Sequence, residues 1–140
     1  NCNAVFFLGR TTDYPTAQEG ALKMKEISYI HCEAYPAGEL KHGALALVEK
    51  GVTVVGLTTD LSLVEKMRTS LSEVATRGAD VVCMSPYSLG YDGFHLPSVN
   101  EFVAPLVSVV PLQLLAYHVA KLLGRDIDKP RNLAKSVTVE

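Results

Sequence analysis

The residues of this chain that could carry out carbonyl and proton-transfer chemistry are Lys23, Glu26, His42 and Lys135. Lys135 lies in a C-terminal segment of small and β-branched residues, with no acidic neighbour before the final residue. Partial desolvation in such a segment would lower the pKa of the amine and make it a nucleophile towards carbonyl carbons. Most lysines near a C-terminus are solvated surface charges, so this prediction depends on the residues that accompany Lys135.

Glu19, Lys23 and Glu26 follow one another at intervals of four and three residues, which places them on one face of a helix. On an ordinary surface helix such a row is a solvated ladder of ion pairs worth roughly 0.2–0.5 kcal/mol each. The flanking Leu22 and Ile30 predict partial burial instead. A partly buried Glu26 beside the cation of Lys23 could act as a general base.

His42 lies between two glycines, in Gly38-Glu39-Leu40-Lys41-His42-Gly43. A histidine at such a turn could shuttle a proton near neutral pH, although for a histidine taken alone a capping or hydrogen-bonded structural role is the more common one. The other histidines, His31, His95 and His118, have no metal-ligand spacing with one another or with a cysteine. We therefore predict no metal site, and we expect His118 to be a core or interface residue.

Buried strands alternate with amphipathic helices along the chain. Apolar runs predict strands at 4–9, 52–57 and 80–84 and a short one at 94–96, and the helical patterns cover 14–30, 39–48, 62–77 and 101–123. Such alternation is typical of an α/β fold whose mostly parallel sheet has helices on both faces. Ligands of such sheets bind at the carboxyl ends of strands, and the loop 9–13 is one such end.

The first predicted helix also has a face of small residues for close packing on the sheet. Ala17, Ala21, Met24 and Ser28 recur at helical spacing on the side opposite the charged row. Thr11, Thr12 or Asp13 could cap this helix at its start.

Composition places the chain among globular domains. Its 140 residues are 48% hydrophobic and 20% charged with a net charge of -2, which fits one domain, 1–140, and disfavours nucleic acid or a membrane as partner. Prolines and polar residues interrupt the longest uncharged run, 102–120, which favours a buried helix over a membrane span. Three widely spaced cysteines and no secretory signal predict reduced thiols in the cytoplasm.

Four blocks of sequence resemble the C-terminal part of the glutamine–fructose-6-phosphate aminotransferase (glucosamine-6-phosphate synthase) family. The blocks are 19–29, 37–43, 111–118 and 130–140, and the match runs in order from about Phe7 to the last residue. The resemblance implies a three-layer, flavodoxin-like SIS domain, the second of two in the isomerase half of that family. The glutaminase domain and the first SIS domain have no counterpart in this chain.

The resemblance also implies an activity and a role for each matched residue. The family makes glucosamine 6-phosphate from fructose 6-phosphate and ammonia released from glutamine, without a cofactor. Lys135 is similar to its Schiff-base lysine, Glu26 to its base for C1–C2 proton transfer, and Lys23 to the lysine beside that base. His42 is similar to its ring-opening histidine, which enters from a neighbouring subunit and so implies a homodimer.

Ala134, Lys23 and Glu19 match positions that contact the sugar in that family. Other positions depart from its usual pattern, namely Thr11, Gln18 and Ala44. The family grips the sugar phosphate with a Ser/Thr-rich loop of its first SIS domain, which this chain lacks. We therefore expect a half-site, inactive or weakly active alone.

Two alternatives remain open at this level. One is a non-catalytic SIS module that binds a sugar phosphate or provides a dimer interface, and the other is a related deglycase that acts on sugar–amine adducts. The joint presence of Glu26, His42 and Lys135 disfavours the first, and the tail sequence disfavours the second.

Overall fold

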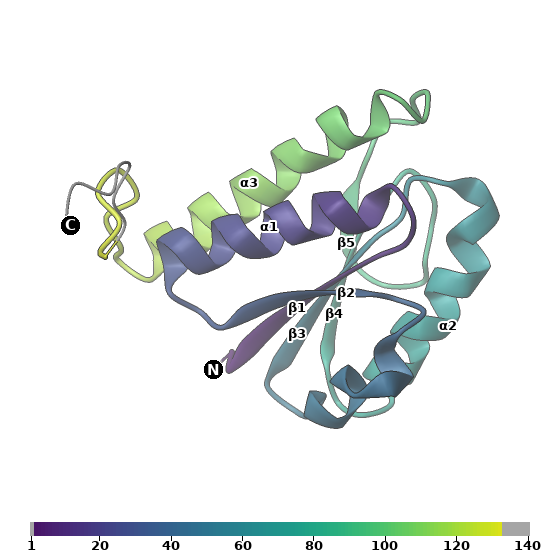
Figure 1. Ribbon diagram of the computed structural model, residues 1–140, viewed down its shortest axis with the longest axis horizontal. Coiled ribbons are helices and arrows are strands. Elements are labelled where there is room, and N and C mark those ends of the chain that lie inside the picture. Colours follow the sequence, from purple (N-terminus) through teal and green to yellow (C-terminus); the bar gives the residue numbers. More distant parts are fainter. Residues whose placement is uncertain (1, 133–140) are drawn as a thin grey trace, which may run out of the picture.

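A five-stranded parallel sheet forms the centre of the protein (Figure 1). The computed structural model describes residues 2–132. Its strands are β1 (Ala4–Gly9), β2 (Cys32–Pro36), β3 (Val52–Leu57), β4 (Asp80–Ser85) and β5 (Gly93–His95), in the order β2-β1-β3-β4-β5. Every neighbouring pair is parallel. This is the flavodoxin-like order, in which the direction of winding changes between β1 and β3.

Helices cover both faces of the sheet, as the sequence predicts. The helices α1 (Asp13–Ser28) and α3 (Ala104–Leu122) lie side by side on one face, and α2 (Val64–Ala75) covers the other (Figure 1). Short 3₁₀ turns complete the second face: η1 (Leu40–His42), η2 (Ala44–Leu47) and η3 (Leu61–Leu63).

The structure corrects the sequence prediction between the first helix and the second predicted strand. Residues 32–36, expected to be irregular, form the edge strand β2. Its Glu33 and Tyr35 stay partly exposed, so β2 has no continuous apolar run to reveal it. The helix expected at 39–48 is two 3₁₀ turns, because Gly43 between them has φ 149°, which is incompatible with a continuous helix.

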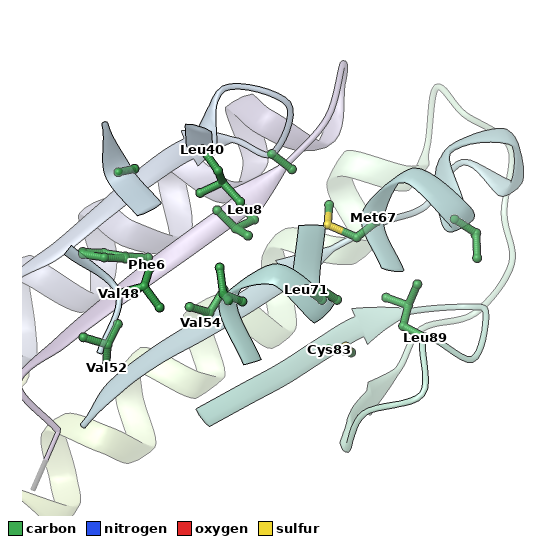
Figure 2. Close-up of a cluster of buried hydrophobic side chains, with 14 residues drawn as sticks. Phe6, Leu8, Leu40, Val48, Val52, Val54, Met67, Leu71, Cys83 and Leu89 are labelled. Carbon is green, nitrogen blue, oxygen red and sulfur yellow. The ribbon is translucent and has the colours of Figure 1, made fainter. Parts of the chain in front are cut away.

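Alternate residues of β1 serve two separate cores. Phe6 and Leu8 face the α2 side, where they join Leu40, Val54 and Leu71 (Figure 2). Val5 and Phe7 face α1 and α3 instead. All four predicted small residues of the first helix are buried, which confirms their packing role: Ala17, Ala21, Met24 and Ser28.

The helices α1 and α3 approach closely at a glycine. A Cβ on Gly20 would lie 3.1 Å from the side chain of Leu112 in α3, so a larger residue would push the two helices apart. Leu112, Ala116 and Ala120 of α3 are buried. By length and composition α3 could also cross a membrane, a property that core helices of globular proteins share.

The opposite side of α3 is apolar and exposed. Leu106, Val110 and Leu114 expose 70%, 50% and 48% of their surface. They line a groove of about 390 Å³ between β5 and α3, together with Phe94 and Leu96. Isolated exposed leucines are ordinary, whereas a continuous exposed apolar patch is typical of interaction surfaces and ligand grooves.

Candidate functional site

The predicted charged row lies on α1, on the side away from the sheet. The Nζ atom of Lys23 donates a hydrogen bond to Oε2 of Glu26 at 2.9 Å and lies 3.7 Å from Oε1 of Glu19. The side chains of Glu26 and Lys23 expose 27% and 36% of their surface. The row is thus half-buried rather than a fully solvated ladder, as the flanking apolar residues predict.

The ion pair decides the charge state of Lys23. Its hydrogen bond to Glu26 is the largest of the effects that raise the pKa of Lys23, and the charges of Glu26 and Glu19 add to it. Lys23 is therefore a fixed cation at physiological pH and not a free amine nucleophile. Its ammonium group donates a hydrogen bond to the carboxylate of Glu26 and so fixes the position of that side chain.

A tyrosine at the end of α1 holds the segment that leads into the C-terminal tail. The hydroxyl oxygen of Tyr29 accepts a hydrogen bond from the backbone N–H of Arg131 at 2.9 Å. The guanidinium groups of Arg131 and Arg125 lie 4.2 and 5.3 Å from the centre of its ring. The structure therefore brings the approach to the tail within three residues of Glu26 along α1.

Lys135 and Ala134 lie outside the described residues. Their predicted roles in imine formation and sugar binding remain predictions.

His42 and Glu26 lie at opposite ends of the strands of the sheet. His42 follows the carboxyl end of β2, where Pro36 pairs with Gly9, whereas Glu26 precedes the amino end, where Cys32 pairs with Val5. The two positions are separated by the length of a strand, on the order of 15–20 Å. The structure therefore does not bring His42 to the charged row of the same chain.

The local environment of His42 is a solvent-exposed turn. Its side chain is 75% exposed, and its Nε2 atom lies 3.7 Å from a carboxylate oxygen of Glu39. Gly43 ends the turn with φ 149°, a backbone conformation that glycine adopts without strain. An exposed imidazole on a fixed turn is free to reach a partner outside its own chain.

At the carboxyl ends of β1 and β3, where ligands of this topology usually bind, a buried carboxylate joins the start of α1 to the loop after β3. The Asp13 carboxylate accepts hydrogen bonds from the backbone N–H and the hydroxyl of Thr59, at 2.8 and 2.7 Å. Asp13 is 2% exposed, and burial raises its pKa although the bonds from Thr59 oppose the shift. Arg10 of the same loop lines a cavity of about 250 Å³ together with Gly38, Lys41 and Lys66, and the ligand role expected of the loop 9–13 remains a prediction.

Helix capping also differs from the sequence prediction. Thr12 is the N-cap residue of α1, but its side chain makes no capping hydrogen bond, and Asp13 bonds to Thr59 instead. The carboxylate thus ties the first helix to the end of β3.

Other polar candidates stay outside the site. Within residues 2–132, no group of three or more His, Cys, Asp and Glu side chains could hold a metal ion. His118 is exposed on α3 against the edge of the Tyr117 ring, so it is not a core residue. Cys32 and Cys83 are buried free thiols, and burial raises the pKa of Cys32 to about 12.

Sequence reasoning overlooked Tyr29, Arg125 and Thr59. Tyr29 and Arg131 are 102 residues apart, and Asp13 and Thr59 are 46 apart, so no local pattern relates them. The position of Tyr29 after a helix would have suggested a C-cap, but an aromatic residue is not a usual one.

The fold and the site together define a class: a doubly wound α/β domain of flavodoxin-like strand order, with a half-buried Lys–Glu ion pair on its first helix. The chain belongs to the SIS domain family, whose model matches residues 1–123. It is 56% identical to glutamine–fructose-6-phosphate aminotransferase (isomerizing) of Thermus thermophilus, in an alignment that covers 96% of this chain and 23% of that protein. The chain thus spans about a quarter of the length of such relatives.

Solved structures agree with this assignment. The C-terminal domain of glucosamine-fructose-6-phosphate aminotransferase from Francisella tularensis superimposes with a TM-score of 0.86 at 43% identity, over 92% of this chain and 38% of that one. A glucosamine-6-phosphate deaminase from Thermotoga maritima gives a TM-score of 0.79 at 28% identity, over 97% and 40%. The predicted resemblance to the C-terminal part of the aminotransferase family is confirmed.

Proposed function

We propose that this chain supplies the imine-forming lysine and the proton-transfer carboxylate of an enzyme that makes glucosamine 6-phosphate from fructose 6-phosphate and glutamine-derived ammonia. The observation that carries the proposal is the half-buried Lys23–Glu26 pair near the end of α1. The segment that leads into the C-terminal tail contacts Tyr29 at the same end of this helix. Relatives that are 56% and 53% identical to this chain are named glutamine–fructose-6-phosphate aminotransferase (isomerizing).

The chemistry assigns one step to each group. The Lys135 amine attacks the C2 carbonyl carbon of the open-chain ketose and expels water, which leaves an imine. Ammonia then replaces the lysine at C2. Because an imine acidifies the neighbouring C–H bond, Glu26 can take a proton from C1 and return it to C2. The imine nitrogen gains a proton and the C1 hydroxyl loses one, so that the product is a 2-amino aldose. Lys23 holds the carboxylate in position through its hydrogen bond, and the steps require no cofactor.

His42 acts in a neighbouring copy of the site in this proposal. His42 lies at the carboxyl ends of the strands, whereas Glu26 lies at their amino ends, and its side chain is exposed. Both observations support a contribution of His42 across a subunit boundary. Such sharing requires at least a homodimer. The exposed apolar side of α3 supports association as well, because such a surface is stabilised when a partner covers it.

The phosphate of the sugar is held outside this chain. From the similarity to the aminotransferase, of which this chain covers 23%, we assign the phosphate contacts to a first SIS domain, with 1–140 as the second. Each charge-assisted hydrogen bond lost with that domain is worth roughly 1.5–3 kcal/mol, so this chain alone binds sugar weakly. The free cysteines fit a cytoplasmic enzyme.

A sugar–amine deglycase or deaminase is the second candidate. The similarity to the Thermotoga deaminase favours it, since removal of ammonia from an amino sugar is the reverse of the proposed synthesis. The two differ in their dependence on glutamine: a synthase consumes glutamine or ammonia, whereas a deaminase releases ammonia from glucosamine 6-phosphate without either.

Borohydride trapping tests the proposal. The complete natural protein that contains this chain is incubated with fructose 6-phosphate, reduced with borohydride, and digested for peptide mass spectrometry. We expect a reduced sugar adduct on Lys135, absent in Lys135→Ala and undiminished in Lys129→Ala. A folded protein that turns over substrate without an adduct on Lys135 would contradict the imine mechanism.

A further inference from the structure

We infer that a cavity beside α2 binds a phosphate group through Arg10, Lys41 and Lys66. The cavity measures about 250 Å³ and lies between the loop after β1, the turn that leads into η1, and α2, and each of these segments contributes one of the three cations. It lies at the carboxyl ends of the strands, whereas the Lys23–Glu26 pair lies at their amino ends. The site therefore goes beyond the proposed function and is separate from the reacting sugar of the same chain.

The guanidinium group of Arg10 is anchored in the wall of this cavity. Its Nη2 atom donates a hydrogen bond to the Oγ atom of Ser70 at 3.0 Å, and Ser70 donates one to the backbone carbonyl of Ala37, also at 3.0 Å. Ser70 itself is buried. An anchored guanidinium presents its other N–H groups in a planar fork, which matches the spacing of phosphate oxygens.

Gly38 provides the space that this guanidinium occupies. A Cβ on Gly38 would lie 3.1 Å from the Nη1 atom of Arg10, so a larger residue would press against the cation. Gly38 is not among the glycines with positive φ, so its backbone conformation does not require glycine. The missing side chain is explained by the room that it leaves for Arg10 in the cavity.

The positive charge of the cavity is only partly compensated. Lys41 pairs with Glu73 at 2.8 Å, but within residues 2–132 no carboxylate lies within 4.0 Å of the cationic nitrogens of Arg10 or Lys66. The Nε atom of Arg10 is also buried and has no acceptor in the described part of the chain. Buried charges and N–H groups are usually paired, so an anion is the ligand that completes this cavity.

The size and charge of the cavity indicate which anion it takes. Drug-sized ligands occupy pockets of about 300–1,000 Å³, so this cavity suits inorganic phosphate or the phosphate ester of a small metabolite better than a nucleotide. A doubly charged phosphate gains more from several cations than a monocarboxylate does. Bound phosphate would connect Lys41 to Lys66 and so attach η1, which carries His42, to α2.

Lysine acetylation, read by peptide mass spectrometry, tests the site in the complete natural protein that contains this chain. Inorganic phosphate at ten times its dissociation constant should slow the acetylation of Lys41 and Lys66 by roughly 10-fold, because most sites are then occupied. Exposed Lys50 should react at an unchanged rate in the same sample. Sodium chloride at equal ionic strength should protect neither lysine. Equal protection by chloride would mean charge screening and would overturn the site.

Two variants locate the protection in the cavity. Arg10→Met removes the guanidinium and should raise the phosphate concentration for half-protection by roughly 10-fold or more. Because Arg10 also bonds to Ser70, Lys66→Gln at an exposed position is the second variant, and its protection is measured at Lys41 with the same expected rise. Lys50→Gln is the matched control and should behave as the wild type. Half-protection of Lys41 at the wild-type concentration in Lys66→Gln would overturn the inference.

Three ligands distinguish the forms in which the phosphate group binds. Half-protection of Lys66 at a lower concentration of glucose 6-phosphate than of inorganic phosphate would identify a phosphate ester as the ligand, and the reverse order would identify the free anion. Acetate that protects as well as phosphate would overturn the preference for a phosphate group. None of these results depends on an adduct at Lys135, so this site and the proposed function are judged separately.

Discussion

At the scale of single residues, Asp13 shows how one buried carboxylate joins two elements of the fold. It lies where the winding of the sheet reverses, and Thr59 supplies both of its hydrogen bonds. The start of α1 is thereby attached to the loop after β3.

Replacement of Asp13 by alanine should destabilise the fold. The variant leaves the backbone N–H of Thr59 without its acceptor, and a part-buried unpaired donor costs about 1–3 kcal/mol. Chemical denaturation at pH 7 measures the loss of unfolding free energy. Asp80→Ala, which removes an exposed carboxylate at the start of β4, is the control and should change it little. Equal effects of the two substitutions would contradict the structural role of Asp13.

The raised pKa of Asp13 also predicts a pH dependence of stability. Burial raises this pKa above its ordinary value of 3.8, so the folded protein holds the proton more tightly than the unfolded chain. Between the ordinary and the raised pKa, the unfolding free energy must therefore fall as pH rises, and above both values Asp13 contributes no further change. Denaturation curves measured across this pH range should show the fall of the unfolding free energy with rising pH in the wild type and not in Asp13→Ala.

At the scale of elements, the turn that carries His42 depends on the glycine that follows it. Gly43 has φ 149°, and a Cβ there would meet no atom within 4 Å, so an alanine is strained only through its backbone. Gly90, in the loop between β4 and β5, has φ 83° and equally open surroundings. The two glycines form a matched pair.

Both Gly43→Ala and Gly90→Ala should lower the unfolding free energy by about 1–2 kcal/mol, the cost of the left-handed conformation for an L-residue. If the η1 turn presents His42 to a neighbouring site, only Gly43→Ala should reduce turnover of the cyclic sugar by the complete protein. Steady-state rates of both variants, measured well below their unfolding temperatures, check this expectation. An equal reduction by Gly90→Ala would mean that lost stability, and not a displaced histidine, lowers the rate.

The elements that the sequence predicts well are those with strong local signals. The apolar strands β1, β3 and β4 and the helices α1, α2 and α3 all have the expected periodicity. The edge strand β2 escaped prediction because half of its residues face solvent and its register comes from pairing with β1. Likewise, the helical spacing of Lys23 and Glu26 predicts their pairing on α1. Contacts between distant segments, such as that of Tyr29 with Arg131, have no sequence signature.

At the scale of the whole molecule, the exposed apolar side of α3 bears on whether the protein associates with itself. Leu106 is 70% exposed beside the groove of about 390 Å³ at β5, next to other exposed apolar residues of the helix. Leu61 is 66% exposed at η3, on another part of the surface. If α3 forms an association surface, a charge at Leu106 should matter more than one at Leu61.

We therefore expect this protein to self-associate with increasing concentration, and Leu106→Glu to shift it towards the monomer. Leu61→Glu should associate as the wild type does, since it lies outside the groove. Neither change should lower the unfolding temperature of the monomer, because both side chains are exposed. Sedimentation equilibrium measures the effect, and identical association of the two variants would show that α3 is not the contact surface.

The central claim is that Lys135 forms an imine with the open-chain sugar and that, once ammonia has replaced the lysine, Glu26 moves a proton from C1 to C2. The most direct measurement is the rate of glucosamine 6-phosphate formation by Glu26→Gln in the complete natural protein, with borohydride trapping on Lys135 in the same sample. We expect the adduct to form as in the wild type while product formation falls by about 10²- to 10⁴-fold, the usual contribution of a general base. Product formation at the wild-type rate would contradict the account.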